Sequence, residues 1–146
     1  MRLRSLQLKL VLKKKDAEAA LFYNSDSARL NPNMIYFSGY KGMGALIIPK
    51  KRAPFLIAPE MEVQRAKKSM VKRVYSMEKK RFFESIYKIA RKNRLKTKNI
   101  AIDKSNFTLN SYMHFRKQFK KIKAKDIALE CLKLREIKTE KEIKML

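Results

Sequence analysis

The chain has 146 residues, of which 45% are hydrophobic, and its formal net charge at pH 7 is +24. This length and composition fit one folded domain with its own core and exclude a disordered chain. No run of 18 apolar residues occurs, the first residues do not form a signal peptide, and a single cysteine excludes an internal disulfide, so we expect a cytoplasmic protein with no membrane partner.

The positive charge has two interpretations. A basic chain attracts phosphates and releases counterions when it binds them, which would favour a nucleic-acid-binding protein. Most of the basic residues are lysines, however, and they are spread along the sequence rather than gathered on one predicted face. Since arginine supplies most specific recognition of phosphates and bases, we expect nucleic acid to bind only non-specifically.

The N-terminal part begins with a segment that has two interpretations. Leucines alternate with other residues in 1–15 as they do in a strand, but the apolar residues could also share one helical face. From Ala17 onward, the sequence AEAALFY predicts a buried strand. The turn-rich segment 24–33 follows, and Asn31-Pro32-Asn33 is its clearest turn marker.

Every glycine of the chain lies in one segment, NMIYFSGYKGMGALIIP, residues 33–49. Apolar runs at 34–37 and 45–48 flank the glycines, and both predict strands. The order G-x-x-G-x-G, followed by strand-like residues, matches neither a dinucleotide fingerprint nor a P-loop. We therefore predict a turn between two strands that requires positive φ angles. The candidate site is this structural turn, and its residues are Asn33, Tyr36, Gly39, Gly42 and Gly44.

Strands and helices alternate in the rest of the chain. Strands are predicted at 55–58, 71–77, 98–103 and 120–126, and helices at 60–69, 78–94, 105–119 and 127–138. This order predicts an α/β sandwich with a mixed β-sheet. The residues expected to face the core are Val63 and Ala66 in the first helix, Phe82, Phe83, Ile86, Tyr87 and Ala90 in the second, and Leu109, Tyr112, Met113 and Phe119 in the third.

Few residues are suited to catalysis. The one histidine, His114, lies in the middle of a predicted helix and is expected to be partly buried and hydrogen-bonded, and Cys131 is expected to be a small buried apolar side chain. No H-x-x-x-H, C-x-x-C or D-x-D cluster occurs, and the acids Asp26, Glu60 and Asp103 are scattered. The sequence therefore predicts neither catalytic nor metal-binding residues within this chain.

The pattern of the C-terminal segment predicts a further helix. Thr139-Glu140-Lys141-Glu142 has the S/T-x-x-E pattern of a capping box, and apolar residues follow it up to Leu146. The remaining two turns are shorter than the roughly 12–15 residues that an isolated helix needs. Either these residues form a short helix that docks on the domain, or they begin a helix that continues in a longer protein, and we expect the second.

Four segments in order resemble the creatinase/prolidase family of metallopeptidases. NPNMIYFSGYKGMGALIIP is similar to the N-x-x-Y-[LF]-[ST]-G-[FY] segment of the family's N-terminal domain, and FLIAPEMEVQRAK is similar to its next strand and short helix. IAID before a Ser/Thr-led helix resembles a later strand–helix unit. LREIKTEKEIKML resembles the L-R-x-I-K-[ST]-x-x-E-I segment that joins this domain to the catalytic one.

The resemblance implies a fold and a division of the chain. The fold would be a three-layer α/β sandwich like ribonuclease H, with a mixed β-sheet flanked by helices. Residues 1–138 would form the N-terminal domain, and 139–146 would begin the linker helix to a C-terminal catalytic domain that this chain lacks. In the family, that domain carries two divalent metal ions, Mn, Co or Zn, and hydrolyses the bond before proline in short peptides. The N-terminal domain supports homodimerisation and walls the active site.

The resemblance therefore implies a non-catalytic domain of an Xaa-Pro dipeptidase or aminopeptidase. None of the family's metal ligands has a counterpart in this chain, so the metals would belong to the missing domain. Two alternatives stay open: a stand-alone binding module related to catalytically dead copies of the peptidase fold, and a basic nucleic-acid-binding protein.

Overall fold

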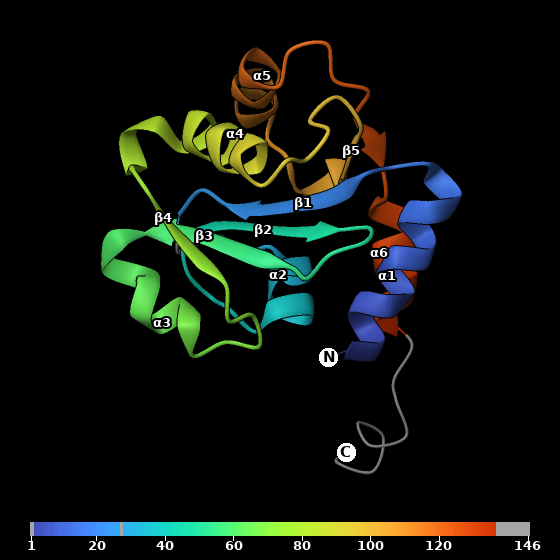
Figure 1. Ribbon diagram of the computed structural model, residues 1–146, viewed down its shortest axis with the longest axis horizontal. Helices are drawn as coiled ribbons and strands as arrows, with labels where there is room; N and C mark the ends of the chain where they lie inside the picture. The colour runs from blue at the N-terminus through green and yellow to red at the C-terminus, as the bar shows by residue number, and fades with distance from the viewer. Residues whose placement is uncertain (1, 27, 137–146) are drawn as a thin grey trace.

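The computed structural model describes residues 2–26 and 28–136, and these residues form one six-stranded sheet covered by helices (Figure 1). The strands are β1 (Ala19–Asn24), β2 (Gly44–Pro49), β3 (Phe55–Pro59), β4 (Val74–Met77), β5 (Ile100–Ile102) and β6 (Lys125–Asp126). The α-helices are α1 (Arg2–Lys15), α2 (Pro32–Ser38), α3 (Val63–Lys67), α4 (Phe82–Lys92), α5 (Leu109–Gln118) and α6 (Ala128–Glu136). Short 3-10 turns η1 (Glu60–Glu62), η2 (Lys79–Arg81) and η3 (Lys104–Asn106) precede α3, α4 and α5.

The sheet is mixed, with the strand order β4-β3-β2-β1-β5-β6. β2 runs antiparallel to both of its neighbours, with Ala19 opposite Pro49 and Ile47 opposite Phe55. The pairs β1–β5, β3–β4 and β5–β6 are parallel. Every strand except β2 therefore points the same way, and the sheet has one end where these five strands begin and one where they finish.

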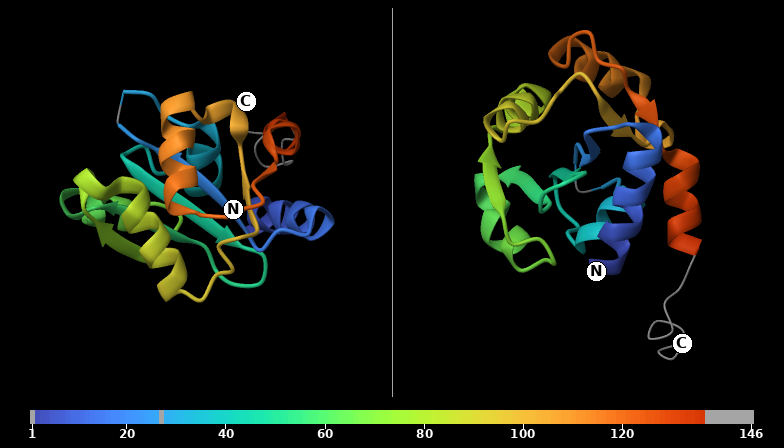
Figure 2. Two further views of the ribbon diagram at one scale, coloured as in Figure 1. Left: turned by 90° about the horizontal axis from the view of Figure 1, so that it is seen from above. Right: turned by 45° about the vertical axis from the view of Figure 1, so that its right-hand side comes forward.

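Helices cover both faces of the sheet. On one face, α1, α2, α3 and α6 pack over a core that includes Leu8, Met34, Ala66 and Cys131. On the other face, α4 and α5 pack over a second core that includes Ile86 and Phe115 (Figure 2). Because each strand alternates its side chains between the two cores, nearly all of the central strands is buried. The predicted three-layer α/β sandwich is confirmed.

The two interpretations of the N-terminal segment are resolved in favour of a helix. Leu8 and Leu12 are fully buried against the sheet, whereas Leu6 and Leu10 are 57% and 63% exposed. Lys13, Lys14 and Lys15 occupy the last turn of α1, where cations interact favourably with the free carbonyl groups. The alternating leucines therefore do not mark a strand.

The strand predicted at 34–37 is wrong, because these residues belong to helix α2. Asn31 caps the helix by accepting a hydrogen bond from the backbone N–H of Asn33, and Pro32 occupies the first turn, where proline is tolerated. Gly39 ends the helix in the left-handed conformation, with φ of 75°. The Asn-Pro-Asn sequence that predicted a turn is thus a helix start, and the glycines connect a helix to a strand.

The other predicted elements are present, with two corrections in the helix at 105–119. Leu109 and Met113 are 78% and 64% exposed, whereas Phe115 and Phe119 are buried. The helix begins at Thr108, whose side chain accepts from the N–H of Ser111, and this start sets which side faces the sheet. His114 is exposed as well, so the expectation that this histidine is partly buried is also wrong. In the first predicted helix, Ala66 is buried, and Val63 is half-buried.

The linker helix predicted at 139–146 lies outside the described residues. Among the helices that are described, none has both the length and the hydropathy that a membrane span requires.

Candidate functional site

The glycine segment connects the end of α2 to the start of β2. Gly39 has a φ of 75° and Gly44 a φ of 146°, so both occupy backbone conformations that favour glycine. Gly42 lies against the ring of Tyr40, and a Cβ added there would collide with the Tyr40 hydroxyl. The positive φ predicted for this segment is therefore present at Gly39 and Gly44.

Tyr40 restrains this connection from the core side. Its side chain is 2% exposed, and its hydroxyl donates to the carbonyl oxygen of Met43 at 2.7 Å. The hydroxyl also lies 3.4 Å from a carboxylate oxygen of Glu62. Burial, reinforced by the negative charge of Glu62, raises the pKa of Tyr40. The tyrosine therefore stays neutral and keeps its proton for the bond to the segment.

Asn33, in the first turn of α2, joins this helix to the end of β5. Its side-chain amide donates to Asp103, which follows β5 and is 3% exposed. The same carboxylate accepts from the backbone N–H and hydroxyl of Ser105 and from the side-chain amide of Asn106. These bonds compensate for burying the charge of Asp103. The side-chain oxygen of Asn33 is buried and accepts no hydrogen bond from the described protein atoms.

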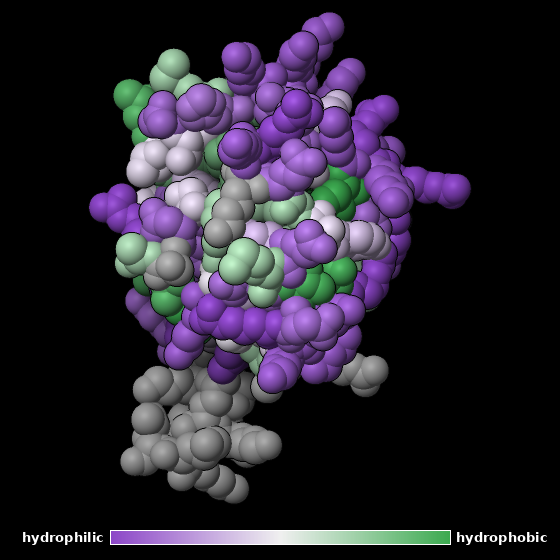
Figure 3. All heavy atoms as spheres, turned by 90° about the vertical axis from the view of Figure 1, so that its left-hand side faces the viewer, coloured by the Kyte–Doolittle hydropathy of each residue, from purple (hydrophilic) through white to green (hydrophobic). Residues whose placement is uncertain are grey.

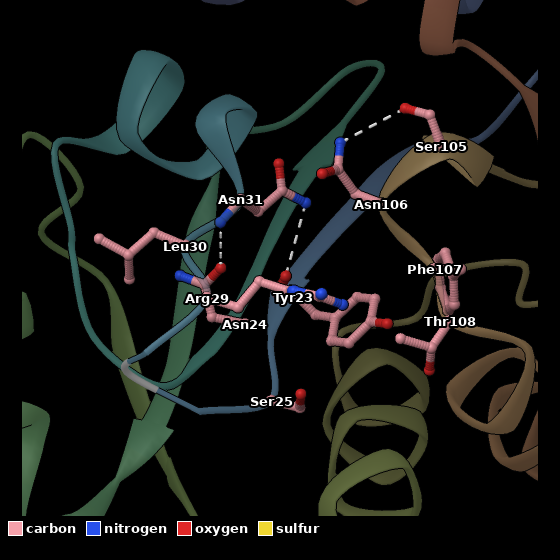
Figure 4. A pocket seen from close by; sticks show the side chains of 10 residues that line it. All are labelled: Tyr23, Asn24, Ser25, Arg29, Leu30, Asn31, Ser105, Asn106, Phe107 and Thr108. Atoms are coloured by element: carbon pink, nitrogen blue, oxygen red, sulfur yellow. Dashed lines mark hydrogen bonds between the residues drawn. The ribbon is translucent and has the colours of Figure 1, made fainter.

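A second pair of asparagines extends this polar network to β1. The side-chain oxygen of Asn24 accepts from the backbone N–H of Asn31 at 2.5 Å, and its amide donates to the carbonyl of Gly42 at 3.0 Å. The amide of Asn31 donates in turn to the carbonyl of Tyr23 at 3.4 Å (Figure 4). The ends of β1 and β5, the start of α2 and the glycine segment are therefore tied together by side-chain amides.

A cleft of about 410 Å³ opens beside this network (Figure 4). Its lining residues come from the segments that follow β1 and β5: Tyr23, Asn24, Ser25, Arg29, Leu30, Asn31, Ser105, Asn106, Phe107 and Thr108. Burial raises the pKa of the Tyr23 hydroxyl, and the nearby positive charge of Arg29 opposes this rise. Arg29 is the cation among these lining residues, so the cleft is polar and weakly basic.

The position of the cleft follows from the topology. The chain leaves β1 for α2 on one face of the sheet, and it leaves the neighbouring parallel strand β5 for α5 on the other face. Where connections diverge in this way, a crevice opens at the carboxyl ends of the strands, and ligands of α/β proteins commonly bind there. The cleft is thus the part of the described structure best placed to meet a ligand or a neighbouring domain.

The five predicted site residues do not form one site. Asn33 and Gly42 belong to the polar network beside the cleft. Tyr36 points away from it, donating from its hydroxyl to the carbonyl of Leu134 at 2.9 Å, and its ring lies 4.1 Å from the guanidinium of Arg4. Tyr36 therefore joins α2 to α6 and α1.

The sequence interpretation missed Asn24, Asn31 and the role of Asp103. A polar residue directly after a buried strand was the available signal, since such residues meet at the carboxyl edge of a parallel sheet. Both Asn24 and Asp103 occupy that position, at the ends of neighbouring strands.

The described residues offer little chemistry of their own. No group of three histidine, cysteine or acidic side chains among them is placed to hold a metal ion. Cys131 is fully buried, as predicted, and burial, reinforced by the charge of Asp103, raises the pKa of its thiol to about 12. The described part of the chain therefore does not fit the two-metal centre that the family implies.

Cys131 should fail to react with a thiol reagent at pH 8 in the folded protein and should react rapidly in denaturant, because the thiolate is the reactive form. The unfolded thiol ionises near 9.0 and the folded one near 12, so folding stability should fall as the pH rises between these values. At pH 10 the expected loss is about 1.4 kcal/mol relative to Cys131→Ala. Urea unfolding of both proteins at pH 8 and 10 measures it, and an equal decline in both would contradict the assignment.

Replacing Gly39 with valine should lower the free energy of unfolding by about 2 kcal/mol, because a β-branched residue is strained at its φ of 75°. The space itself is adequate, since an added Cβ would lie 3.5 Å from the nearest atom of Met70. Gly39→Asn is the matched control and should cost less, because asparagine tolerates the left-handed conformation. Thermal unfolding compares the two, and an unchanged melting temperature for the valine variant would contradict a strained position.

The sequence matches the Creatinase/Prolidase N-terminal domain family over residues 2–137. The chain therefore belongs to this family. A comparison with curated proteins found no significant match.

Solved structures with the same fold are Xaa-Pro peptidases and their isolated domains. The X-Pro aminopeptidase from Thermotoga maritima MSB8 superimposes with a TM-score of 0.75 at 25% identity, over 88% of this chain and 36% of the enzyme. A proline dipeptidase from Streptococcus pneumoniae TIGR4 gives a TM-score of 0.72 at 17% identity, over 92% of this chain and 98% of that one. The N-terminal domain of Xaa-Pro dipeptidase from Lactobacillus brevis gives 0.70 at 16% identity, over 88% and 98%. The chain thus spans about a third of the Thermotoga enzyme.

Proposed function

We propose that this chain is the non-catalytic N-terminal domain of a cytoplasmic, metal-dependent Xaa-Pro dipeptidase or aminopeptidase. The observation that carries the proposal is the family match over residues 2–137, together with a fold shared with 36% of an X-Pro aminopeptidase. The hydrolysis of proline-containing peptides, with two divalent ions such as Mn, Co or Zn, then belongs to a C-terminal domain.

The described residues lack a set of metal ligands, which supports assigning the metal ions to a separate catalytic domain. The described residues present no cluster of metal-binding side chains, and His114 is an exposed helical residue. The domain therefore contributes shape rather than chemistry. We assign it the support of a homodimer and the restriction of substrate access, and we place the glycine segment near the mouth of the peptidase pocket or the second subunit.

Two helices of the domain present apolar side chains that suit such contacts. Leu6 and Leu10 are exposed on α1, and Leu129 and Leu132 are 59% and 45% exposed on α6. These two helices lie side by side at one edge of the molecule (Figure 1), and α6 is the last described element. Burying leucine side chains against a neighbouring domain would stabilise the assembly by removing them from water.

Assaying both the chain and the protein encoded by its complete gene tests the proposal. Reading the gene beyond Leu146 should reveal a series of Asp, Asp, His, Glu and Glu ligands. With added Mn²⁺, the complete protein should hydrolyse Xaa-Pro dipeptides, whereas the 146-residue chain should not. Hydrolysis by the chain alone, or the absence of the ligand series from the gene, would contradict the proposal.

A further inference from the structure

The direction of the strands divides the molecule into two ends with different charge. Because β2 alone runs the opposite way, one end gathers the segments that precede β1, β3, β4, β5 and β6. We call this the basic end, and its segments are 13–18, 50–54, 72–73, 91–99 and 120–125.

These segments are dominated by lysine and arginine. The basic residues in them are Lys13, Lys14, Lys15, Lys50, Lys51, Arg52, Lys72, Arg73, Arg91, Lys92, Arg94, Lys96, Lys98, Lys120, Lys121, Lys123 and Lys125, and all but Lys50 and Lys125 are exposed. The acids in the same segments are Asp16 and Glu18. The fold therefore brings together 17 of the 34 lysine and arginine residues in the described part of the chain, so the charge is less dispersed in space than along the sequence.

Most of the remaining described carboxylates lie at the opposite end. Glu60, Glu62, Glu78 and Asp103 follow β3, β4 and β5, and Asp126 ends β6. The candidate cleft is at this acidic end. The molecule is consequently polarised along the strand direction, with the candidate cleft and most of the described carboxylates at one end and half of the described lysines and arginines at the other.

Hydrogen bonds hold cations from distant parts of the chain close together at the basic end. Lys9 donates to the carbonyl of Arg52 at 2.7 Å, and Arg52 donates to the carbonyl of Asn93 at 2.6 Å. Arg73 donates to the side chain of Asn93 at 2.9 Å. At the neighbouring strand, the backbone N–H of Lys123 donates to the carbonyl of Lys98 at 2.8 Å.

Local helix chemistry accounts for part of this charge. Lys13–Lys15 and Arg91–Lys92 occupy the last turns of α1 and α4, where cations interact favourably with free carbonyl groups. It does not account for the loop cations at 50–52, 96–98 and 121–123. Within the described residues, the ion pairs join Lys15, Arg65, Arg81 and Lys88 to carboxylates, so Lys15 is the member of the basic end that has such a partner.

We propose that the basic end binds the phosphate backbone of nucleic acid, a function separate from that of a peptidase domain. A protein–protein interface of comparable size would carry an apolar centre. The exposed large hydrophobic residues of the described structure are Leu6, Leu10, Met61, Leu109, Met113, Leu129 and Leu132, and none lies in these segments. Leu6 and Leu10 lie at the border of the basic end, where they line a hollow with Lys13, Lys50 and Lys51, so the apolar surface flanks the cations and does not form their centre. The left-hand side of the molecule in Figure 1, which faces the viewer in Figure 3, is likewise mostly hydrophilic, with scattered apolar areas.

The composition of the basic end fits binding without sequence specificity. Lysine presents a compact, strongly hydrated charge that attracts phosphate without the bidentate geometry of arginine. Such binding has a dissociation constant of about 10⁻⁴–10⁻⁶ M at physiological salt and weakens steeply as salt is added. The surface therefore fits a long phosphate chain of either DNA or RNA.

Two charge-reversal variants of equal net charge test the proposal. The first, Lys51→Glu, Lys96→Glu and Lys123→Glu, changes exposed residues of the basic end. The matched control, Lys41→Glu, Lys80→Glu and Lys104→Glu, changes exposed residues of the acidic end. Fluorescence anisotropy with a labelled duplex of mixed sequence, between about 50 and 200 mM salt, measures the affinity and its salt dependence for all three proteins.

The basic-end variant should bind at least tenfold more weakly, and its log–log salt slope should fall by about 2.7, or about 0.9 for each of three lost phosphate contacts. The control should retain most of the affinity, and circular dichroism should show all three proteins folded. Equal losses in both variants would mean that net charge, not the basic end, drives binding and would overturn the proposal. Equal or tighter binding of polyglutamate would overturn the assignment to a phosphate backbone.

Discussion

Replacing Gly44 with alanine is expected to lower the free energy of unfolding by about 2–6 kcal/mol, which is a large effect for the addition of one methyl group. Gly44 begins β2 with a φ of 146°, which strains any other residue by about 1–3 kcal/mol. An added Cβ would also overlap the backbone carbonyl oxygen of Ile57 on the neighbouring strand. Backbone cannot move aside as a side chain can, so the overlap adds about 1–3 kcal/mol.

Gly39→Ala is the control for this experiment because it shares the positive φ without the overlap. It should cost about 1–2 kcal/mol, the usual penalty for the left-handed conformation. Urea unfolding followed by circular dichroism gives both values from the shift in midpoint at constant slope. Equal losses for the two variants would show that close packing of β2 against β3 does not require glycine at position 44.

Replacing Asp103 with leucine is expected to lower the free energy of unfolding by about 3–5 kcal/mol. The buried carboxylate accepts hydrogen bonds from Asn33, Ser105 and Asn106, and leucine would leave these donors without a partner in the protein interior. Asp103→Asn should also destabilise the protein, because its amide would place a second donor against the amides of Asn33 and Asn106.

Asp26→Ala is the control for the loss of an aspartate that accepts backbone hydrogen bonds. Asp26 is exposed and accepts from the N–H groups of Ala28 and Arg29 at 2.8 and 2.9 Å. Its loss should cost about 1 kcal/mol or less, because water replaces the carboxylate. Denaturant unfolding compares the variants, and a loss at Asp103 no greater than at Asp26 would mean that the polar network does not hold the strand ends together.

The polar network also explains how the described residues form a defined surface beside the candidate cleft. Asn24 fixes the glycine segment to the end of β1, Asn33 fixes the preceding helix α2 to the end of β5, and Tyr40 supports the segment from the core side. A segment restrained in this way can wall a neighbouring pocket without losing much conformational entropy when the assembly forms. Stability and access to a downstream active site would then depend on the same few side chains.

Local sequence signals were sufficient for most of the elements. The apolar runs at 45–48 and 55–58 are buried as expected, and in helix α4 Phe83, Ile86 and Ala90 are buried while Phe82 and Tyr87 are half-buried. These patterns depend only on the helix or strand itself. The family motifs were sufficient for the fold. Cys131 was correctly placed in the core, since a lone cysteine without a partner behaves as a small apolar residue.

Other features depended on helix ends that the sequence interpretation overlooked or on contacts between distant residues. Met34–Phe37 has a strand-like composition, but the Asn31 cap and the left-handed Gly39 make it a helix. In α5, Thr108 fixed the start of the helix, so Phe115 and not Met113 faces the sheet. Asp103 gained its role from Asn33, which is far away in the sequence.

The charge shows most clearly what the sequence determines and what the tertiary structure determines. The sequence by itself determined that the protein is strongly basic, because charge is a sum over residues and needs no fold. Only the tertiary structure decided that half of the described lysines and arginines share one end of the molecule. Five parallel strands bring together the segments that precede them, however far apart these lie in the chain, and no local pattern records that strand order.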